Sequence, residues 1–275
     1  MRNLNEANVT DAVLGKLENC ADPRLKDVVA SLVRHLHGFI REVEPTEEEW
    51  LAGIRFLTEV GQKCDDKRQE YILLSDTLGA SILMDAINHR ISEGATESSV
   101  LGPFYREGAP VMESGASTAG DTQGEVVTFR GRVHAPDGRP IEGAMLDVWQ
   151  TAPNGLYEVQ DPDQPDFNLR GKFSTDADGT YEIRTVKPVS YSIPDDGPVG
   201  KLLKAVGRHT FRPAHVHFIV SAEGYEPVVT QLFTEGDEYL ESDAVFGVKN
   251  SLVVPYQRRN GGHLVEYDFG LRPIA

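Results

Sequence analysis

Proline and glycine are distributed unevenly along this 275-residue chain, and this asymmetry limits the choice of fold more than any other feature. Residues 1–100 contain 2 of the 16 prolines and 6 of the 26 glycines, whereas residues 101–275 contain 14 and 20. Segments with few helix breakers favour helices, and segments rich in them favour short strands joined by turns. The sequence therefore predicts a helical N-terminal part followed by a β-rich part.

Three amphipathic helices are expected in the N-terminal part. One carries apolar residues at helical spacing from Leu25 to Leu36, and the next follows a capping box made by Thr46 and Glu49. A third helix is predicted over Tyr71–Ile91, with apolar residues on many of its sides. We expect such a helix to face a substrate cavity or a second subunit as well as its own neighbours.

The hydrophobic period changes from helical spacing to strict alternation near residue 125. Short strands without intervening helices are typical of an antiparallel β-sandwich. We place the boundary so that residues 1–95 form the helical region and residues 96–275 the β-sandwich. The strands are expected over Val127–Val133, Ala144–Trp149, Thr180–Thr185, His215–Ser221, Pro227–Phe233, Ser251–Tyr256 and Leu264–Phe269.

Charge and cysteine content exclude several classes of protein. Lys and Arg total 27 against 43 Asp and Glu, a net charge of −16, which argues against nucleic acid and anionic membranes as partners. No segment approaches the ~20 apolar residues of a membrane span. The two cysteines, Cys20 and Cys64, form neither a disulfide framework nor a thiolate metal site. We therefore expect a cytoplasmic protein without nucleic acid or membrane insertion.

Two histidines are the first candidates for chemistry. His215 and His217 lie two residues apart in a predicted strand, so their side chains point to the same face and form half of a metal site. An isolated pair of this kind is more often an ordinary strand feature. Here His209 lies nearby, so that three of the eight histidines fall within nine positions.

Two tyrosines are the second candidates. Tyr157 and Tyr191 both lie in predicted loops that follow strands. A tyrosine is most often a packing residue whose hydroxyl has a hydrogen-bond partner. Packing explains these loop positions less easily, so both are candidate ligands.

Several motifs together resemble those of the intradiol ring-cleavage dioxygenases, non-haem iron(III) enzymes of aromatic catabolism. The resemblance lies in Gly155–Tyr157, the Pro188–Tyr191 loop and the segment Arg212–His217, and Trp149-Gln150 and Thr230–Phe233 fit the same pattern. It extends from about residue 10 to the C-terminus. The helical N-terminal region is similar to the catechol/hydroxyquinol branch of the family rather than to the protocatechuate branch.

The resemblance implies one Fe(III) per chain, with Tyr157, Tyr191, His215 and His217 as its ligands. Phenolates and imidazoles form an electron-rich set that suits a trivalent cation. In this family pattern Tyr191 also acts as a base toward the substrate. Arg212 would stabilise negative charge that develops on the ring, and Gln231 would orient the substrate or the histidines. A simpler interpretation of Arg212 pairs it with a surface carboxylate.

The resemblance also implies a substrate pocket for a flat aromatic ring, which requires mostly apolar walls. Asp76 is the exception, because its carboxylate could accept a hydrogen bond from a third ring hydroxyl and would be left unpaired beside catechol. We therefore expect hydroxyquinol (benzene-1,2,4-triol) and O2 as substrates and maleylacetate as product. The implied pocket residues are Leu73, Asp76, Val100, Leu101, Gly102, Pro103, Phe104, Ile193, Pro194, Arg212, Val245 and Phe246.

Other functions stay open at this point. The nearest alternative is a catechol 1,2-dioxygenase, which forms cis,cis-muconate. A chlorinated or methylated hydroxyquinol is a further candidate substrate. From a different class, Arg130–Gly138 resembles transthyretin-like modules, in which the histidines and tyrosines would be structural. A cupin-type metal site is a weaker alternative. Asp76 itself could be a polar residue of the helix without a role in binding.

The expected helices are more apolar than a short helical layer on one sandwich face can bury. We therefore expect a homodimer through the N-terminal region. The resembling branch dimerises in this way, and some members hold a lipid in the interface, so the resemblance allows a bound lipid here.

Overall fold

The computed structural model describes residues 2–65, 68–90 and 93–274. It contains two compact units, Met1–Thr58 and Glu59–Ala275. The helices that begin in the first unit are α1 (Val9–Gly15), α2 (Pro23–Val43) and α3 (Glu47–Lys63). No helix in the described ranges is long and apolar enough to cross a membrane.

Both long helices begin at side-chain caps. The Asp22 carboxylate accepts hydrogen bonds from the backbone N–H groups of Arg24 (2.8 Å) and Leu25 (3.1 Å) at the start of α2. At the start of α3, Glu49 N–H donates to Thr46 Oγ1 (3.2 Å) and Thr46 N–H donates to Glu49 Oε2 (2.8 Å). The predicted capping box is therefore confirmed.

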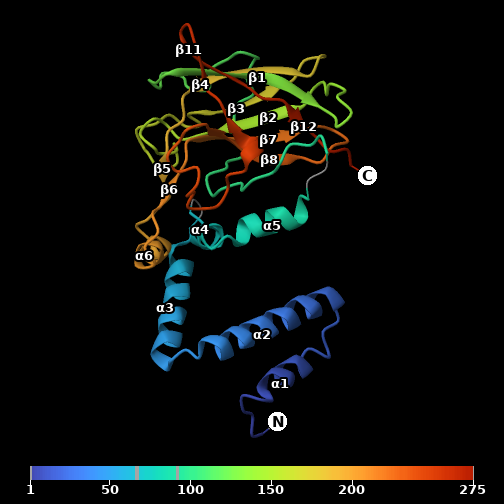
Figure 1. Ribbon diagram of the computed structural model, residues 1–275, viewed down its shortest axis with the longest axis vertical. Helices are drawn as coiled ribbons and strands as arrows, with labels where there is room; N and C mark the ends of the chain where they lie inside the picture. The colour runs from blue at the N-terminus through green and yellow to red at the C-terminus, as the bar shows by residue number, and fades with distance from the viewer. Residues whose placement is uncertain (1, 66–67, 91–92, 275) are drawn as a thin grey trace. The chain divides into compact units, whose positions relative to one another are not determined.

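The second unit is built on two layered sheets (Figure 1). The first sheet contains β1 (Val126–His134), β4 (Thr180–Val186), β10 (Gln257–Arg259), β11 (Gly262–Glu266) and β12 (Phe269–Gly270). The second sheet contains β2 (Met145–Trp149), β3 (Arg170–Ser174), β7 (His215–Ser221), β8 (Val228–Thr234) and β9 (Val253–Val254). Aromatic side chains join the layers, as where the Phe129 and Phe218 rings meet at 5.8 Å.

The expected helix over Tyr71–Ile91 is wrong as a single element. It is two helices, α4 (Glu70–Thr77) and α5 (Ala80–Asn88), and Ile91 lies outside the described residues. The break falls at Gly79, whose positive φ of 74° is a left-handed conformation that ends α4. An eight-residue helix that was not predicted, α6 (Pro198–Ala205), begins with proline in its first turn.

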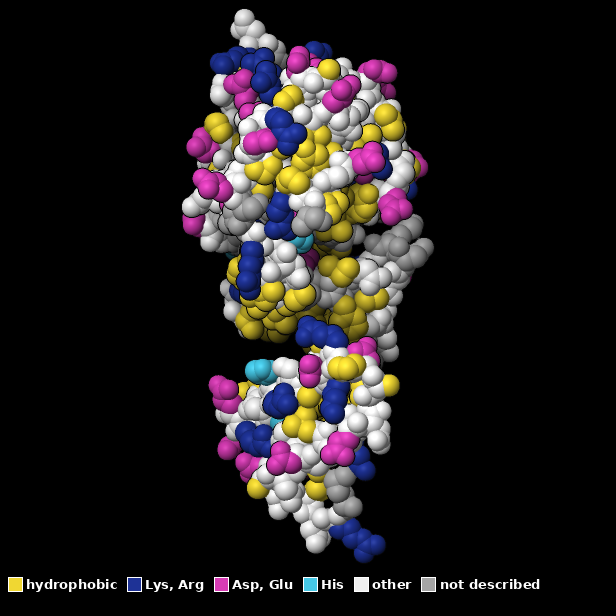
Figure 2. Space-filling view, turned by 90° about the vertical axis from the view of Figure 1, so that its right-hand side faces the viewer, with side chains coloured by type: hydrophobic (Ala, Val, Ile, Leu, Met, Phe, Trp, Pro, Cys, Tyr) yellow, Lys and Arg dark blue, Asp and Glu magenta, His cyan; other side chains and the backbone are white. Residues whose placement is uncertain are grey.

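The helices of this unit leave apolar surface uncovered. Figure 2 shows hydrophobic side chains gathered at the end of the unit that carries α4, α5 and α6. Their exposed members include Leu78, Leu83, Met84 and Ile87. A surface of this kind is typical of contact with another molecule.

The sheets are mixed rather than wholly antiparallel. Strand β1 pairs parallel with β11 and β12, and β8 pairs parallel with β9. The strand predicted over Leu264–Phe269 is interrupted between β11 and β12, where the chain runs close beside Gly131 of β1. Most of the strand predicted over Ser251–Tyr256 is likewise replaced by a 3₁₀ turn, η1 (Asn250–Leu252), and the short β9. The two-layer β-rich fold itself is confirmed.

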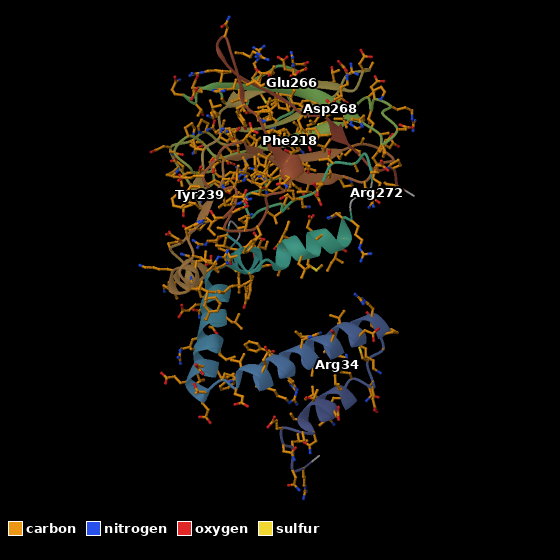
Figure 3. The ribbon with its side chains drawn as sticks, viewed as in Figure 1. Arg34, Phe218, Tyr239, Glu266, Asp268 and Arg272 are labelled. Atoms are coloured by element: carbon orange, nitrogen blue, oxygen red, sulfur yellow. The ribbon has the colours of Figure 1, made fainter. Side chains whose placement is uncertain are left out.

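Gly131 is required at this close approach. A Cβ atom there would lie 1.8 Å from the carbonyl oxygen of Tyr267. The adjacent Arg132 N–H donates to Asp268 Oδ1 at 2.8 Å, which holds the segment between β11 and β12 against β1. Figure 3 shows Glu266 and Asp268 in the first sheet, with Phe218 below them.

Substitution of Gly131 by alanine should destabilise the fold. We expect Gly131→Ala to lower the free energy of unfolding by ~1–3 kcal/mol or more, because the methyl group forces backbone atoms apart in a packed region. Gly53→Ala is the control, since a Cβ at this helical glycine meets nothing within 4 Å. Urea unfolding of both variants measures the effect. Equal stabilities for the two variants would contradict this account of the close approach at Gly131.

Candidate metal and substrate site

Three neighbouring backbone segments carry the candidate ligands. His215 and His217 lie on β7, and Trp149 of β2 pairs with His217 in the antiparallel register. Tyr191 lies on the short strand β5 (Tyr191–Ser192), opposite Arg212 of β6 (Phe211–Arg212). Tyr157 follows β2 in a loop, where its N–H donates to the Gln160 side chain at 3.0 Å.

The structure brings these four side chains together. The Nε2 atoms of His215 and His217 are 3.1 Å apart, and His217 Nε2 lies 3.1 Å from Tyr157 Oη. Tyr157 Oη in turn lies 3.4 Å from Tyr191 Oη. All four residues are buried, with at most 6% of any of them exposed. Two nitrogen and two oxygen donors therefore converge on one small buried volume.

The protonation of this cluster suits a cation. Burial, and after it the charge of Arg212, lower the pKa of His215 to about 3. Burial also lowers the pKa of His217 well below its usual value, so both imidazoles are neutral at neutral pH. His215 Nδ1 lies 2.7 Å from the Pro213 carbonyl oxygen and must donate to it, which leaves the Nε2 lone pair facing the cluster.

The tyrosines complete a donor set that a hard metal ion would satisfy. Burial, then the neighbouring Tyr191, raise the pKa of Tyr157 well above its usual value, so its hydroxyl stays protonated until a cation displaces the proton. His217 Nδ1 is buried and has no hydrogen-bond partner among the described residues. Its Nε2 atom is the one that lies beside the other candidate ligand atoms, His215 Nε2 and Tyr157 Oη. The residues present thus fit a trivalent ion with oxygen and nitrogen ligands.

Arg212 lies beside this cluster and is itself buried. Burial lowers its pKa, but Asp243 and Tyr191 raise it by more, so the guanidinium stays charged. Arg212 Nη2 donates to Gln231 Oε1 at 2.7 Å, and Nη1 lies 3.1 Å from His215 Nε2. The interpretation of Arg212 as the partner of a surface carboxylate is wrong, because its ion-pair partner, Asp243, is buried.

Several neighbours of the cluster were not predicted from the sequence. The Trp149 ring stacks on His217 at 4.6 Å with an interplanar angle of 8°. Behind Tyr157, the buried Arg170 donates to the buried Glu158 at 2.7 Å. The sequence carried a signal for two such neighbours: Trp149, which fits the family pattern, and Asp243, an acidic residue just before the predicted pocket residues Val245 and Phe246. His209, by contrast, packs its ring against Tyr239 and is not one of the four converging residues.

A cavity of about 480 Å³ opens beside the cluster and is lined by five of the predicted pocket residues. One of them, Phe104, also stacks on Tyr157 with ring centroids 4.5 Å apart. The charged residues Arg68, Glu70 and Asp196 also line the cavity. The five predicted lining residues are Leu73, Pro103, Phe104, Ile193 and Pro194.

The other predicted pocket residues do not line this cavity. Gly102 is next to His217, since a Cβ at Gly102 would lie 3.4 Å from the imidazole. The Val100 carbonyl accepts a hydrogen bond from Gln231 Nε2, and Val245 is buried. Leu101 is partly exposed, and Phe246 lines a separate hollow with Arg208.

Asp76 lies on α4 and is 3% exposed. The pKa of its carboxyl is raised, chiefly by burial and also by the charge of Asp243, although a hydrogen bond from Ser81 and the charge of Arg212 act in the opposite direction. The carboxyl is therefore within electrostatic reach of Arg212. A hydroxyl group placed between them would have a strong acceptor available.

The chain was compared with known proteins. A family model described as "Dioxygenase" matches residues 100–273, and "Catechol dioxygenase N terminus" matches residues 22–96. A hydroxyquinol 1,2-dioxygenase from a Rhizobium species is 54% identical over 254 residues, which cover 92% of this chain and 86% of the relative. A 6-chlorohydroxyquinol 1,2-dioxygenase from Cupriavidus pinatubonensis is 48% identical and covers 99% of both chains.

Solved structures agree with these relatives. The crystal structure of a hydroxyquinol 1,2-dioxygenase from Pseudomonas putida matches with a TM-score of 0.92 and 51% identity, covering 98% of this chain and 99% of that one. A catechol 1,2-dioxygenase from Acinetobacter radioresistens matches with a TM-score of 0.86 at 30% identity, covering 100% and 95%. These matches decide against the transthyretin-like and cupin alternatives. The chain belongs to the intradiol ring-cleavage dioxygenases.

Proposed function

We propose that this enzyme cleaves hydroxyquinol between its two adjacent hydroxyl-bearing carbons and incorporates both atoms of O2 to form maleylacetate. The observation that carries the proposal is the buried Asp76 carboxyl within electrostatic reach of Arg212, whose Nη1 lies 3.1 Å from His215 Nε2 in the cluster of four converging side chains. The names of the most similar relatives support the same substrate. Catechol lacks the third hydroxyl and would leave this carboxylate without a ligand partner.

We further propose that one Fe(III) per chain is held by the hydroxyl oxygens of Tyr157 and Tyr191 and the Nε2 atoms of His215 and His217. Neutral imidazoles and two phenols at 3.1–3.4 Å from one another support this ligand set. The chemistry that a bound iron would supply is activation of the diol ring toward O2.

The protein's own groups then bind, orient and move protons. Tyr191 would accept a substrate proton at Oη, and so serve as ligand and as base. The Arg212 guanidinium would stabilise negative charge that develops on the ring, in a site where burial strengthens electrostatic interactions. Gln231 holds Arg212 on one side and the Val100 carbonyl on the other, and would thereby keep the substrate wall in place.

We propose that the enzyme is a homodimer through a helical region of residues 1–95, ahead of a catalytic domain of residues 96–275. Exposed apolar side chains on α2, including Leu25, Leu32 and Phe39, support this assembly, as do those on α5. A lipid in the interface would cover the same kind of surface.

Both cysteines are unpaired, which suits a reducing cytoplasm.

The iron site has a direct spectroscopic test. Iron-loaded protein should be red-brown, because tyrosinate bound to Fe(III) absorbs visible light, and Tyr157→Phe should lose much of this band. Tyr181→Phe should keep the band, since Tyr181 is an equally buried tyrosine whose hydroxyl donates to the Tyr267 carbonyl, in the first sheet. Visible absorption and iron content measure both. Protein that stays colourless after iron reconstitution would overturn the proposed ligand set.

The substrate assignment has a separate test in Asp76. We expect Asp76→Asn to lower the hydroxyquinol-to-catechol ratio of kcat/KM by about 10–100-fold, because a charge-assisted hydrogen bond of ~1.5–3 kcal/mol is lost with hydroxyquinol only. Steady-state oxygen uptake with both substrates gives the ratio. An unchanged ratio would remove Asp76 from substrate recognition and favour catechol as an equal substrate.

A further inference from the structure

Most of the N–H donors of the Arg212 guanidinium already have hydrogen-bond acceptors within the protein. It carries five N–H donors, one on Nε and two on each terminal nitrogen. The Nε donor and one Nη2 donor go to the Asp243 carboxylate at 3.0 and 3.1 Å, and the other Nη2 donor goes to Gln231. Only Nη1 faces the cluster, at 3.1 Å from His215 Nε2. Once a metal takes the Nε2 lone pair of His215, both Nη1 donors are available to a substrate.

Asp243 determines this orientation. Its two oxygens bind the Arg212 fork in the bidentate geometry that fixes the rotation of a guanidinium. The carboxylate is as buried as its partner, with side chains 2% and 3% exposed. Burial raises the pKa of Asp243, but Arg212 lowers it by more, so the carboxylate stays ionised.

The same carboxylate folds the loop that follows it. Its oxygens accept hydrogen bonds from the N–H groups of Val245 (3.2 Å) and Gly247 (2.9 Å). Phe246, between them, has a φ of 60°, a left-handed conformation that a non-glycine residue adopts only when its surroundings require it. A Cβ at Gly247 would lie 2.9 Å from Arg212 Nη2, so the loop is closed tightly around the ion pair.

We propose that Asp243 is a positioning residue of the active site, which aims Nη1 of Arg212 at the substrate and holds the Val245–Gly247 loop closed around the ion pair. It acts through Arg212 and not on the substrate. The inference rests on the proposed function, in which Arg212 stabilises charge on the ring.

The test is a double-mutant cycle in the iron-loaded enzyme with hydroxyquinol. We expect Asp243→Asn to lower kcat per bound iron by about 10²-fold, the effect of a small displacement of a catalytic group. Arg212→Gln should lower kcat at least as much, and Asp243→Asn added to Arg212→Gln should lower it no further. The resting tyrosinate band, and the dissociation constant from anaerobic titration with hydroxyquinol, should change by less than about threefold, since ligands and pocket persist.

Asp85→Asn is the matched control, because Asp85 is a largely buried carboxylate paired with Lys249 at 3.0 Å. It should retain kcat per iron even if it lowers stability. Gly247→Ala provides a second variant if Asp243→Asn does not fold, since its methyl group displaces Nη2 while both charges remain. We expect it to lower kcat in the same direction.

The outcomes separate the two proposals. A wild-type protein without an iron band or turnover would overturn the proposed function itself. A coloured, active wild type whose Asp243→Asn and Gly247→Ala variants keep kcat per iron would overturn the role of Asp243 alone. Additive losses in the cycle would also overturn it, because they would show that Asp243 acts independently of Arg212.

Discussion

Burial of the Arg212 guanidinium is the constraint on which the site depends. A charge that is nearly inaccessible to water is costly unless a partner compensates it, and Asp243 does so with two hydrogen bonds. The remaining donors then reach Gln231 and the face of His215. The polar groups around the ligand cluster therefore form one connected network inside a β-rich domain.

The fold brings together segments that are far apart in sequence. Strand β7 supplies two imidazoles, the short β5 and β6 place Tyr191 opposite Arg212, and a loop after β2 supplies Tyr157. Arg208 links this region to α4, since it donates to the carbonyls of Thr77 and Ala244. The helix that carries Asp76 and the loop that follows Asp243 are thus held by one side chain.

How far the sequence predicts this structure depends on the range of the interactions involved. The bounds of β7 were predicted without error, because period-two alternation is a local signal. The capping box of α3 is local in the same way. The break between α4 and α5 was missed because an apolar run hid the left-handed Gly79, and the parallel pairing of β1 with β11 depends on contacts more than a hundred residues apart.

Among the site residues, Asp243 was missed because its partner, Arg212, lies 31 positions away. The convergence of Tyr157 and Tyr191 was expected only through the family resemblance, since their loop positions made them candidate ligands but did not indicate that they meet.

The central claim is that Tyr157, Tyr191, His215 and His217 hold one iron ion. Anomalous diffraction at the iron absorption edge, from crystals of the iron-loaded protein, tests it most directly. The account predicts a single strong peak per chain within bonding distance of the two tyrosine oxygens and the two Nε2 atoms. A peak elsewhere in the molecule, or no peak in crystals whose solution contains stoichiometric iron-bound protein, would contradict it.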